Sequence, residues 1–370
     1  MKNQLLSTTT LAAAVGLFAF GGPIQEASAS EPLEASIGGY LSWTLDYWDQ
    51  EQTRSIGRRN YAMSTDGEVQ VSAKTTLDNG IKVGIRIEFE AHNQGAGSTI
   101  VDEHYVTLEG EFGQLRLGND DNAAYQLHYQ APVAQWRYGV NSPSFAILSK
   151  NGNAVSSYIS TYPGTGGDGT KIIYFTPRIN SIQLAVSYQA DGAVQEGPAP
   201  FGNADGNAGQ QSEILAAGAN IVRDFEGGNV AASIGYTTAN LEGSSGAFGG
   251  TEDRQALTIG LNVGFGDISV GFAYKTDDAG TAGNSDKDTF DIGFTHTVGA
   301  LTWGVNYGGE DQEVVGAVDD EVDAVGFSAT YSVGPGLSII GGVKYYEYDS
   351  AVAAQGPNGV TAGIGALVTF

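Results

Sequence analysis

From about residue 35 to the end of the chain, apolar and polar residues alternate with a period of two. Residues 81–91 show the pattern most plainly. Apolar and polar positions there are Ile81, Val83, Ile85, Ile87 and Phe89 against Lys82, Gly84, Arg86, Glu88 and Glu90. This alternation is typical of a β-strand with one apolar and one polar face. The chain is therefore predicted to be all-β.

Sixteen segments carry this pattern. They predict strands at residues 35–48, 64–77, 81–91, 101–110, 114–119, 170–177, 181–190, 212–223, 228–239, 253–265, 267–276, 287–298, 300–309, 321–333, 336–348 and 359–370. Tight turns such as Asp78-Asn79-Gly80 follow the even-numbered strands, and long polar loops follow the odd-numbered ones. Such sorting of connections predicts an up-and-down antiparallel barrel with both termini of the barrel on the short-turn side.

The face that carries the apolar residues indicates where such a barrel resides. Gly, Ser, Thr, Asn and scattered charges occupy the opposite face, so the interior cannot be a packed core, and sixteen strands enclose a water-filled lumen. Aromatic residues recur on the apolar face near the strand ends, at Trp43, Tyr47, Tyr236, Tyr274 and Tyr307 and at Phe265 and Phe370. The apolar face is therefore predicted to meet lipid, as in outer-membrane barrels.

The N-terminus reads as a secretory signal peptide over residues 1–29. Lys2 gives a positive start, residues 11–20 an apolar stretch, and Ala27-Ser28-Ala29 a small-residue cleavage site. The apolar stretch is well short of the roughly 20 residues that a membrane-spanning helix requires. The expected domain is thus a single barrel over residues 30–370.

Composition and charge narrow the partners. The chain has 54 Gly and no Cys, with 17 Lys and Arg against 42 Asp and Glu, giving a net charge of -25. The acidic balance argues against nucleic acid, and the lack of Cys excludes thiolate sites. Acidic runs in the long loops match no EF-hand pattern, so we expect solvated loops with at most loosely bound Ca²⁺, bridging to lipopolysaccharide, and no required cofactor.

Two segments resemble a known family. Residues 105–118 (YVTLEGEFGQLRLG) resemble the strand–turn–strand segment of Gram-negative general porins, and the last strand ends on an alternating apolar run closed by Phe370. The closest likeness is to porins of alphaproteobacteria, although the Pro-Glu-Phe-Gly signature of enterobacterial porins is absent. This resemblance implies a homotrimer in the outer membrane, with a water-filled channel for small hydrophilic solutes and ions. It also implies that the third long loop folds inward and narrows each pore.

The sequence supplies a candidate for that loop. Residues 119–169 span about 51 residues, far beyond ordinary loop lengths, and such loops are usually functional or disordered. Its aromatic and aliphatic content argues against disorder, with Tyr125, Tyr129, Trp136, Tyr138, Phe145, Ile147 and Leu148. We therefore expect residues 119–169 to form a constriction loop packed against the barrel interior.

Register arguments place basic residues on the inner wall. With Asp78-Asn79-Gly80 as a three-residue hairpin loop, Lys74 lies opposite Gly84 and Arg86 opposite Ser72, with both bases in the lumen. A four-residue loop at residues 111–114 then puts Glu109 directly across from Arg116.

The start of the constriction loop carries the opposing acids, Asp120 and Asp121. The predicted pore constriction thus contains Lys74, Arg86, Glu109, Arg116, Asp120 and Asp121, three bases and three acids. With a nearly balanced constriction and strongly acidic loops around the entrance, we expect moderate cation selectivity that declines as salt rises.

Other functions for the same barrel stay open at this stage. A barrel-based outer-membrane hydrolase would need a nucleophile and base, but the four His residues (His92, His104, His128 and His296) lie in no recognisable catalytic motif. A substrate-specific porin for sugars or phosphate shares the fold, and neither an aromatic ladder nor a strongly basic constriction is evident. The sequence therefore favours a general diffusion channel without enzymatic activity.

Overall fold

The computed structural model describes residues 32–50, 59–91, 100–142, 148–150, 153–155, 159–192, 207–243, 249–281, 286–313, 320–349 and 358–370. The predicted signal peptide, residues 1–29, lies outside the described residues, as do Phe145 and Ile147 of the predicted constriction loop. No helix among the described residues is long and apolar enough to cross a membrane.

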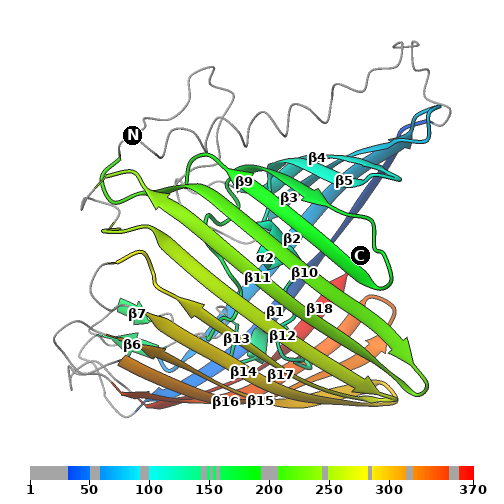
Figure 1. The fold of residues 1–370 in the computed structure, drawn as a ribbon. Coiled ribbons are helices and arrows are strands. Elements are labelled where there is room, and N and C mark those ends of the chain that lie inside the picture. Colours follow the sequence, from blue (N-terminus) through cyan, green and yellow to red (C-terminus); the bar gives the residue numbers. More distant parts are fainter. Residues whose placement is uncertain are drawn as a thin grey trace.

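Sixteen strands close into one antiparallel barrel (Figure 1). In ring order from the N-terminal strand they pair sequentially, and all sixteen predicted strands are confirmed. Their bounds are β1 Glu34–Gln50, β2 Tyr61–Thr76, β3 Lys82–Glu90, β4 Val101–Gly110, β5 Gly113–Asn119, β8 Thr170–Phe175, β9 Ile182–Gln189, β10 Gln211–Phe225, β11 Gly228–Leu241, β12 Arg254–Phe265, β13 Ile268–Asp277, β14 Lys287–Val298, β15 Leu301–Gln312, β16 Asp320–Gly334, β17 Leu337–Asp349 and β18 Gly359–Thr369.

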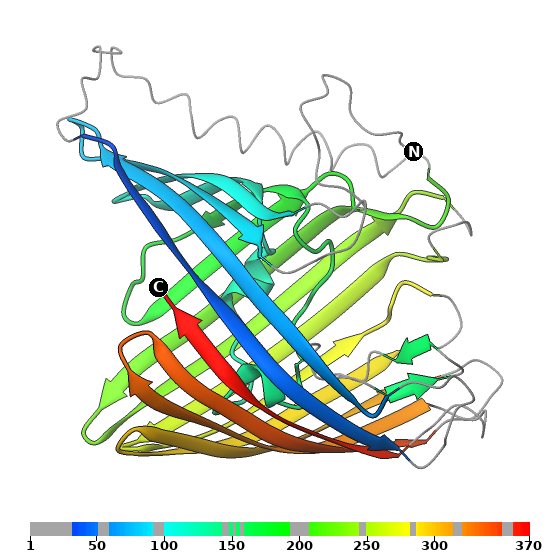
Figure 2. The ribbon, with the colours of Figure 1, turned by 180° about the vertical axis from the view of Figure 1, so that it is seen from behind.

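The barrel closes where the first and last strands meet. β1 pairs with β18 in antiparallel register, from Tyr40 opposite Thr369 to Gln50 opposite Gly359. The backbone amides of Gly39 and Phe370 each donate to the other residue's carbonyl at 3.1 Å. Figure 2 shows the blue β1 beside the red β18. The terminal Phe370 therefore belongs to the closing seam.

The outer surface of the barrel is apolar. Alternate residues along each strand are large, apolar and exposed, as in the β1 set of Leu41, Trp43, Leu45 and Tyr47. The residues between them point inward and are small or polar, with Ser42, Thr44 and Asp46 buried. This arrangement matches the predicted orientation of the two faces, with lipid outside and water inside.

One predicted turn is wrong. Gly110 pairs with Gly113, so only Glu111 and Phe112 form the β4–β5 turn, and Glu109 lies opposite Gln114. Thr107, not Glu109, faces Arg116. Gly113 has a φ of +108°, which an ordinary side chain rarely adopts, and this glycine permits the tighter turn. The predicted pairing of Glu109 with Arg116 is therefore incorrect.

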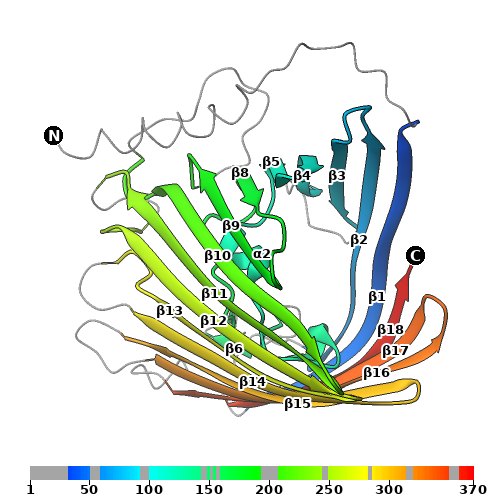
Figure 3. The same cartoon turned by 45° about the vertical axis from the view of Figure 1, so that its right-hand side comes forward.

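The long segment between β5 and β8 carries structure of its own. Its described parts form a short helix, α2 (Ala123–Leu127), a 3₁₀ turn, η1 (Trp136–Tyr138), and a hairpin of β6 (Leu148–Lys150) and β7 (Asn153–Val155). Figure 3 shows α2 within the ring of strands. The barrel interior is thus occupied in part by residues from this segment.

Candidate functional site: a loop seated inside the barrel

We define the pore loop as residues 119–142 and 159–169, the described parts of the predicted constriction loop outside β6 and β7. Its backbone is hydrogen-bonded to inward-facing serines of the barrel wall. Ala123 N donates to Ser187 Oγ of β9 at 3.0 Å, and Tyr129 N to Ser233 Oγ of β11 at 2.9 Å. Gln135 N donates to Ser328 Oγ of β16 at 3.2 Å. The pore loop therefore follows the inner wall from β9 to β16.

The two ends of the pore loop are joined at Asn122, which caps α2. Its Oδ1 accepts from the backbone N–H groups of Ala124 and Tyr125, each at 3.0 Å. Its Nδ2 donates to the carbonyls of Pro163 at 2.7 Å and Thr165 at 3.2 Å. One buried side chain thus begins the helix and also fixes the returning strand of the loop.

The middle of the pore loop is held at a buried histidine. Oγ1 of Thr258 lies 3.1 Å from Nδ1 of His128, and Oγ1 of Thr161 lies 3.1 Å from Nε2. Burial, together with the charge of nearby Lys275, lowers the pKa of His128 to about 4. The imidazole is therefore neutral at physiological pH and serves as a structural link between loop and wall.

The far end of the pore loop is attached to β1 and β2 by a buried ion network. Arg137 places Nη2 3.6 Å from Asp46 and Nη1 3.5 Å from Asp66, and it donates to Ser64 Oγ at 2.6 Å. The hydroxyl of Tyr138 donates to Asp46 at 3.2 Å. The loop thus reaches across the barrel and is anchored on both sides of it.

A row of inward-facing glycines forms the bed in which the pore loop lies. We call it the glycine trough, and it comprises Gly218, Gly235, Gly260, Gly271, Gly293, Gly326 and Gly342 on β10–β14, β16 and β17. A Cβ at Gly260 would lie 1.8 Å from the Tyr129 carbonyl oxygen, and one at Gly293 would lie 2.2 Å from that of Pro132. Close approach of the loop backbone to the wall therefore requires glycine at these positions.

Filling the trough should push the loop toward the pore. We expect Gly260→Ala to lower single-channel conductance and to cost about 1–3 kcal/mol of stability, because the new methyl group overlaps a backbone oxygen. Gly334→Ala is the matched control, since a Cβ there meets nothing within 4 Å. Conductance and unfolding midpoint equal to wild type in Gly260→Ala would show that the loop does not depend on this contact.

The inner wall of β2–β5 faces the pore loop across the lumen. The predicted bases lie here, with Lys74 opposite Gly84 and Arg86 opposite Ser72, as expected. Arg86 is bound to Glu88, which is itself buried. This wall therefore carries both basic and acidic side chains.

The predicted acids take different partners. Asp120 pairs with Arg116, whose Nη1 lies 2.8 Å from the Asp120 carboxylate. This contact agrees with the prediction that Asp120 opposes the bases of the wall. Glu109 instead pairs with Lys82 at 2.9 Å, because the β3–β4 register places these two residues opposite each other. Lys74 and Arg116 share one row of the sheet but lie three strand spacings apart, about 14 Å. The six predicted residues do not form one cluster.

Asp121 lies with acids that the sequence analysis did not single out. Carboxylate oxygens of Glu103, Asp121 and Asp168 all lie within 4.8 Å of one another. Burial, followed by the charges of Asp168 and Asp120, raises the pKa of Asp121 to about 8. Lys171 supplies positive charge beside this group, held by the carbonyls of Gly167 and Gly169 at 2.7 Å and by that of Asp120. This ammonium offsets part of the negative charge of the group.

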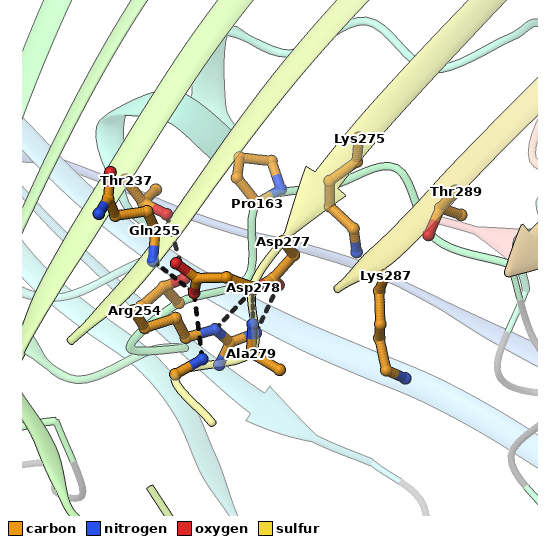
Figure 4. A network of polar contacts seen from close by, with 12 residues as sticks. Pro163, Thr237, Arg254, Gln255, Lys275, Asp277, Asp278, Ala279, Lys287 and Thr289 are labelled. Atoms are coloured by element: carbon orange, nitrogen blue, oxygen red, sulfur yellow. Dashed lines mark hydrogen bonds and ion pairs between the residues drawn. The ribbon is translucent and has the colours of Figure 1, made fainter. Parts of the chain in front are cut away.

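The long-loop ends of β12–β14 form a second charged network (Figure 4). Arg254 binds Asp277 through two hydrogen bonds of 2.8 and 2.6 Å, and the Ala279 amide donates to the same carboxylate. Lys287 pairs with Glu310 at 3.2 Å. Two of the acids in the predicted acidic runs, Asp277 and Glu310, are thus neutralised at the barrel mouth.

Several charged residues of the lumen were not predicted from the sequence. Wall residues Asp46, Asp66, Glu68, Glu88 and Glu103 all have inward positions in the period-two pattern, which was a usable signal. Arg137, Asp168 and Lys171 had no such signal, because their positions depend on how the long loop lies. The inner wall therefore carries more acidic residues than the predicted constriction includes.

A family model described as Gram-negative porin matches residues 8–351. The chain belongs to the Gram-negative porin family. Solved porins share its fold. An anion-selective porin from Comamonas acidovorans is 17% identical, with a TM-score of 0.66 over 92% of this chain and 100% of that one. A triple mutant of the Rhodopseudomonas blastica porin is 18% identical, with a TM-score of 0.58 over 91% of this chain and 100% of that one.

No curated protein sequence matches this porin. Family and fold together make it an outer-membrane β-barrel of a Gram-negative bacterium that forms a channel for small solutes and ions. They favour this function over the barrel-based hydrolase considered from the sequence. At 17% and 18% identity, the solved porins describe the fold alone. Selectivity must therefore be argued from this porin's own side chains.

Proposed function

We propose that solutes cross this porin between the pore loop and the inner wall of β2–β5, that the pore loop forms the constriction, and that cations pass in preference to anions. The observation that carries the proposal is the seating of the loop. Hydrogen bonds to β9, β11 and β16 hold most of the loop along that part of the wall, and Arg137 attaches its far end to β1 and β2. The charges at this passage then decide selectivity.

Acids outnumber bases along the passage. The described bases are Lys74, Arg86, Arg116 and Lys171, and the described acids are Glu68, Glu88, Glu103, Asp120, Asp121 and Asp168. The raised pKa of Asp121, about 8, removes one negative charge at pH 7. The passage still carries more acids than bases, and the whole chain has a net charge of -25. This local balance is close to the near-neutral sum expected from the sequence, so the proposed cation preference rests mainly on the negative charge of the whole chain.

The Comamonas porin is named for anion selectivity, but its fold does not transfer that property. Selectivity arises from the side chains that line the pore, which differ freely at 17% identity.

Reconstitution into planar bilayers, with stepwise conductance and liposome swelling by sugars of graded size, tests the channel proposal. We expect discrete conductance steps and a size cut-off without preference for one sugar. Saturable transport of a single sugar or of phosphate would favour a substrate-specific porin instead.

We further propose that the porin is a homotrimer, packed through the side of the barrel that contains β4–β9. Strands β5, β8 and β9 have only 7, 6 and 8 residues. A strand that crosses the hydrocarbon core needs about 9–11 residues. Their outward residues are nevertheless apolar and exposed, as at Ile172 and Val186. Strands this short leave irregular backbone beside them, and lipid cannot satisfy the hydrogen-bonding groups of that backbone. Contact with another barrel would cover this part of the wall.

Cysteine cross-linking can locate this interface, because the chain has no Cys of its own. Val106→Cys places one thiol on the outward face of β4, and Val270→Cys places one on β13, nearly opposite in ring order. With a long bifunctional maleimide in intact membranes, we expect covalent oligomers from Val106→Cys and few from Val270→Cys. Efficient cross-linking of Val270→Cys alone would place the interface on the other side.

We also propose that the porin needs no cofactor and that divalent cations act only at its lipid-facing rim. At the long-loop ends of the strands, exposed acids occupy outward positions at Glu213, Asp253, Asp288, Asp311, Glu321, Glu347 and Asp349. Tyrosines lie directly below, and the Tyr274 hydroxyl donates to Asp288 at 2.6 Å. A carboxylate belt at the height of lipid headgroups can join phosphorylated lipopolysaccharide only through bridging cations such as Ca²⁺.

A further inference from the structure

Trp136 exposes an indole ring inside the channel. It lies in η1, and 38% of its surface is accessible. Its neighbours in sequence are buried and fixed, because Gln135 is bound to Ser328 and Arg137 to Asp46 and Asp66. Polar contacts therefore anchor the loop on both sides of Trp136. The indole ring itself remains accessible and presents an apolar surface in the lumen.

The indole lies beside an inward-facing tyrosine of β1. The rings of Tyr40 and Trp136 have centroids 6.3 Å apart and meet edge to face at 79°. Tyr40 has the same inward orientation as Ser42 and Thr44 of β1, which are buried toward the lumen. We call these two rings, Trp136 of the pore loop and Tyr40 of β1, the aromatic corner.

Carboxylates continue from this corner along the wall. Tyr40 pairs with Glu68 on β2, and Glu68 pairs with Glu90 on β3, so the three side chains form one row on the inner face. Directly opposed side chains on neighbouring strands lie about 5 Å apart at Cβ. Arg137 is bound to Asp46 and Asp66, and Arg86 to Glu88. Glu68 accepts a hydrogen bond from the side-chain amide of Gln70. The row therefore places carboxyl groups next to an exposed aromatic face.

We propose that this aromatic corner, together with Glu68, binds organic cations with a quaternary or alkylated ammonium group during passage. Such a cation is attracted by the carboxylate and can place its methyl groups against the indole face. A simple metal ion gains only the carboxylate, and a neutral sugar gains only stacking. This inference rests on the proposed cation preference and names the class of solute that the pore retains longest.

Single-channel recording with choline tests the proposal. We expect choline, added to a KCl solution, to interrupt the current in a concentration-dependent way. The neutral molecule of the same shape, 3,3-dimethyl-1-butanol, should not. Equal effects of the two compounds, or no effect of either, would overturn the proposal. The reversal potential in KCl alone is measured on the same channels, so that failure of small-cation preference is recognised separately from failure of choline binding.

Variants assign the binding to the aromatic corner. We expect Trp136→Ala to raise the half-blocking choline concentration about 3- to 10-fold, with most of the effect restored in Trp136→Phe. Glu68→Gln should raise the same concentration while preserving the shape of the side chain. Trp43→Ala, on the outward face of β1, is the matched control and should leave the block unchanged. An unchanged block in both Trp136→Ala and Glu68→Gln would refute the site.

Discussion

Removing the tip of the pore loop should widen the channel. Gln130 and Asn141 are joined by a side-chain hydrogen bond of 2.7 Å, so residues 131–140 can be deleted and the ends linked through two glycines. We expect single-channel conductance to rise roughly twofold or more, with passage of larger sugars, because a 16-stranded barrel without an inserted loop leaves an open aqueous channel. Lys344 of β17 donates to the Gly139 carbonyl at 2.8 Å, and Asp46 accepts from Tyr138, so both wall groups would become hydrated after the deletion.

The folded state of this variant is checked by its heat-modifiable migration on gels. A folded barrel with unchanged conductance and unchanged sugar cut-off would show that residues 131–140 do not limit passage. In that case the constriction would have to be sought elsewhere, and the pairing of Arg116 with Asp120 would have no bearing on solute size.

Replacing the guanidinium that anchors the loop should be strongly destabilising. Arg137 is nearly inaccessible and faces Asp46 and Asp66. We expect Arg137→Met to cost about 3–5 kcal/mol, because removal of one partner leaves buried carboxylates without compensation. We also expect noisier open-channel current, since the loop tip loses its attachment to β1 and β2.

Chemical unfolding in a defined detergent or lipid gives the stability, and bilayer recording gives the noise. Arg178→Met is the matched control, because Arg178 is exposed at the β8–β9 turn and should change stability by little. If Arg137→Met and Arg178→Met were equally stable and equally quiet, the ion network would not anchor the loop.

The barrel itself was predictable because its signal is local. A period of two assigns each residue to a face, so the sixteen strands and the outward apolar set followed directly from the sequence. The Asp78-Asn79-Gly80 turn was also correct, since Leu77 and Ile81 are hydrogen-bonded at 2.8 Å and Gly80 has a φ of +82°. Alternation over a long strand tolerates errors of one or two residues at its ends.

The constriction was predictable only in part. At the β4–β5 turn, a two-residue and a four-residue connection give the same alternation, so the sequence could not choose between them, and Glu109 was paired wrongly. The loop contacts join residues far apart in the sequence, 92 positions for Tyr138 with Asp46 and 193 positions for Gln135 with Ser328. No periodic pattern encodes such contacts. The glycines of the trough were visible in the sequence, but their shared role appears only when the loop lies on them.

The reversal potential across a tenfold KCl gradient at pH 7 tests the central claim most directly. We expect a reversal potential with the sign of cation preference and a magnitude below the roughly 59 mV that a tenfold gradient sets for ideal selectivity. The magnitude should decline as total salt rises, because screening shortens the range over which the fixed charges act. A reversal potential of the opposite sign in the unmodified porin would show that Arg86, Arg116 and Lys74 outweigh the acids of the passage, and would contradict the account.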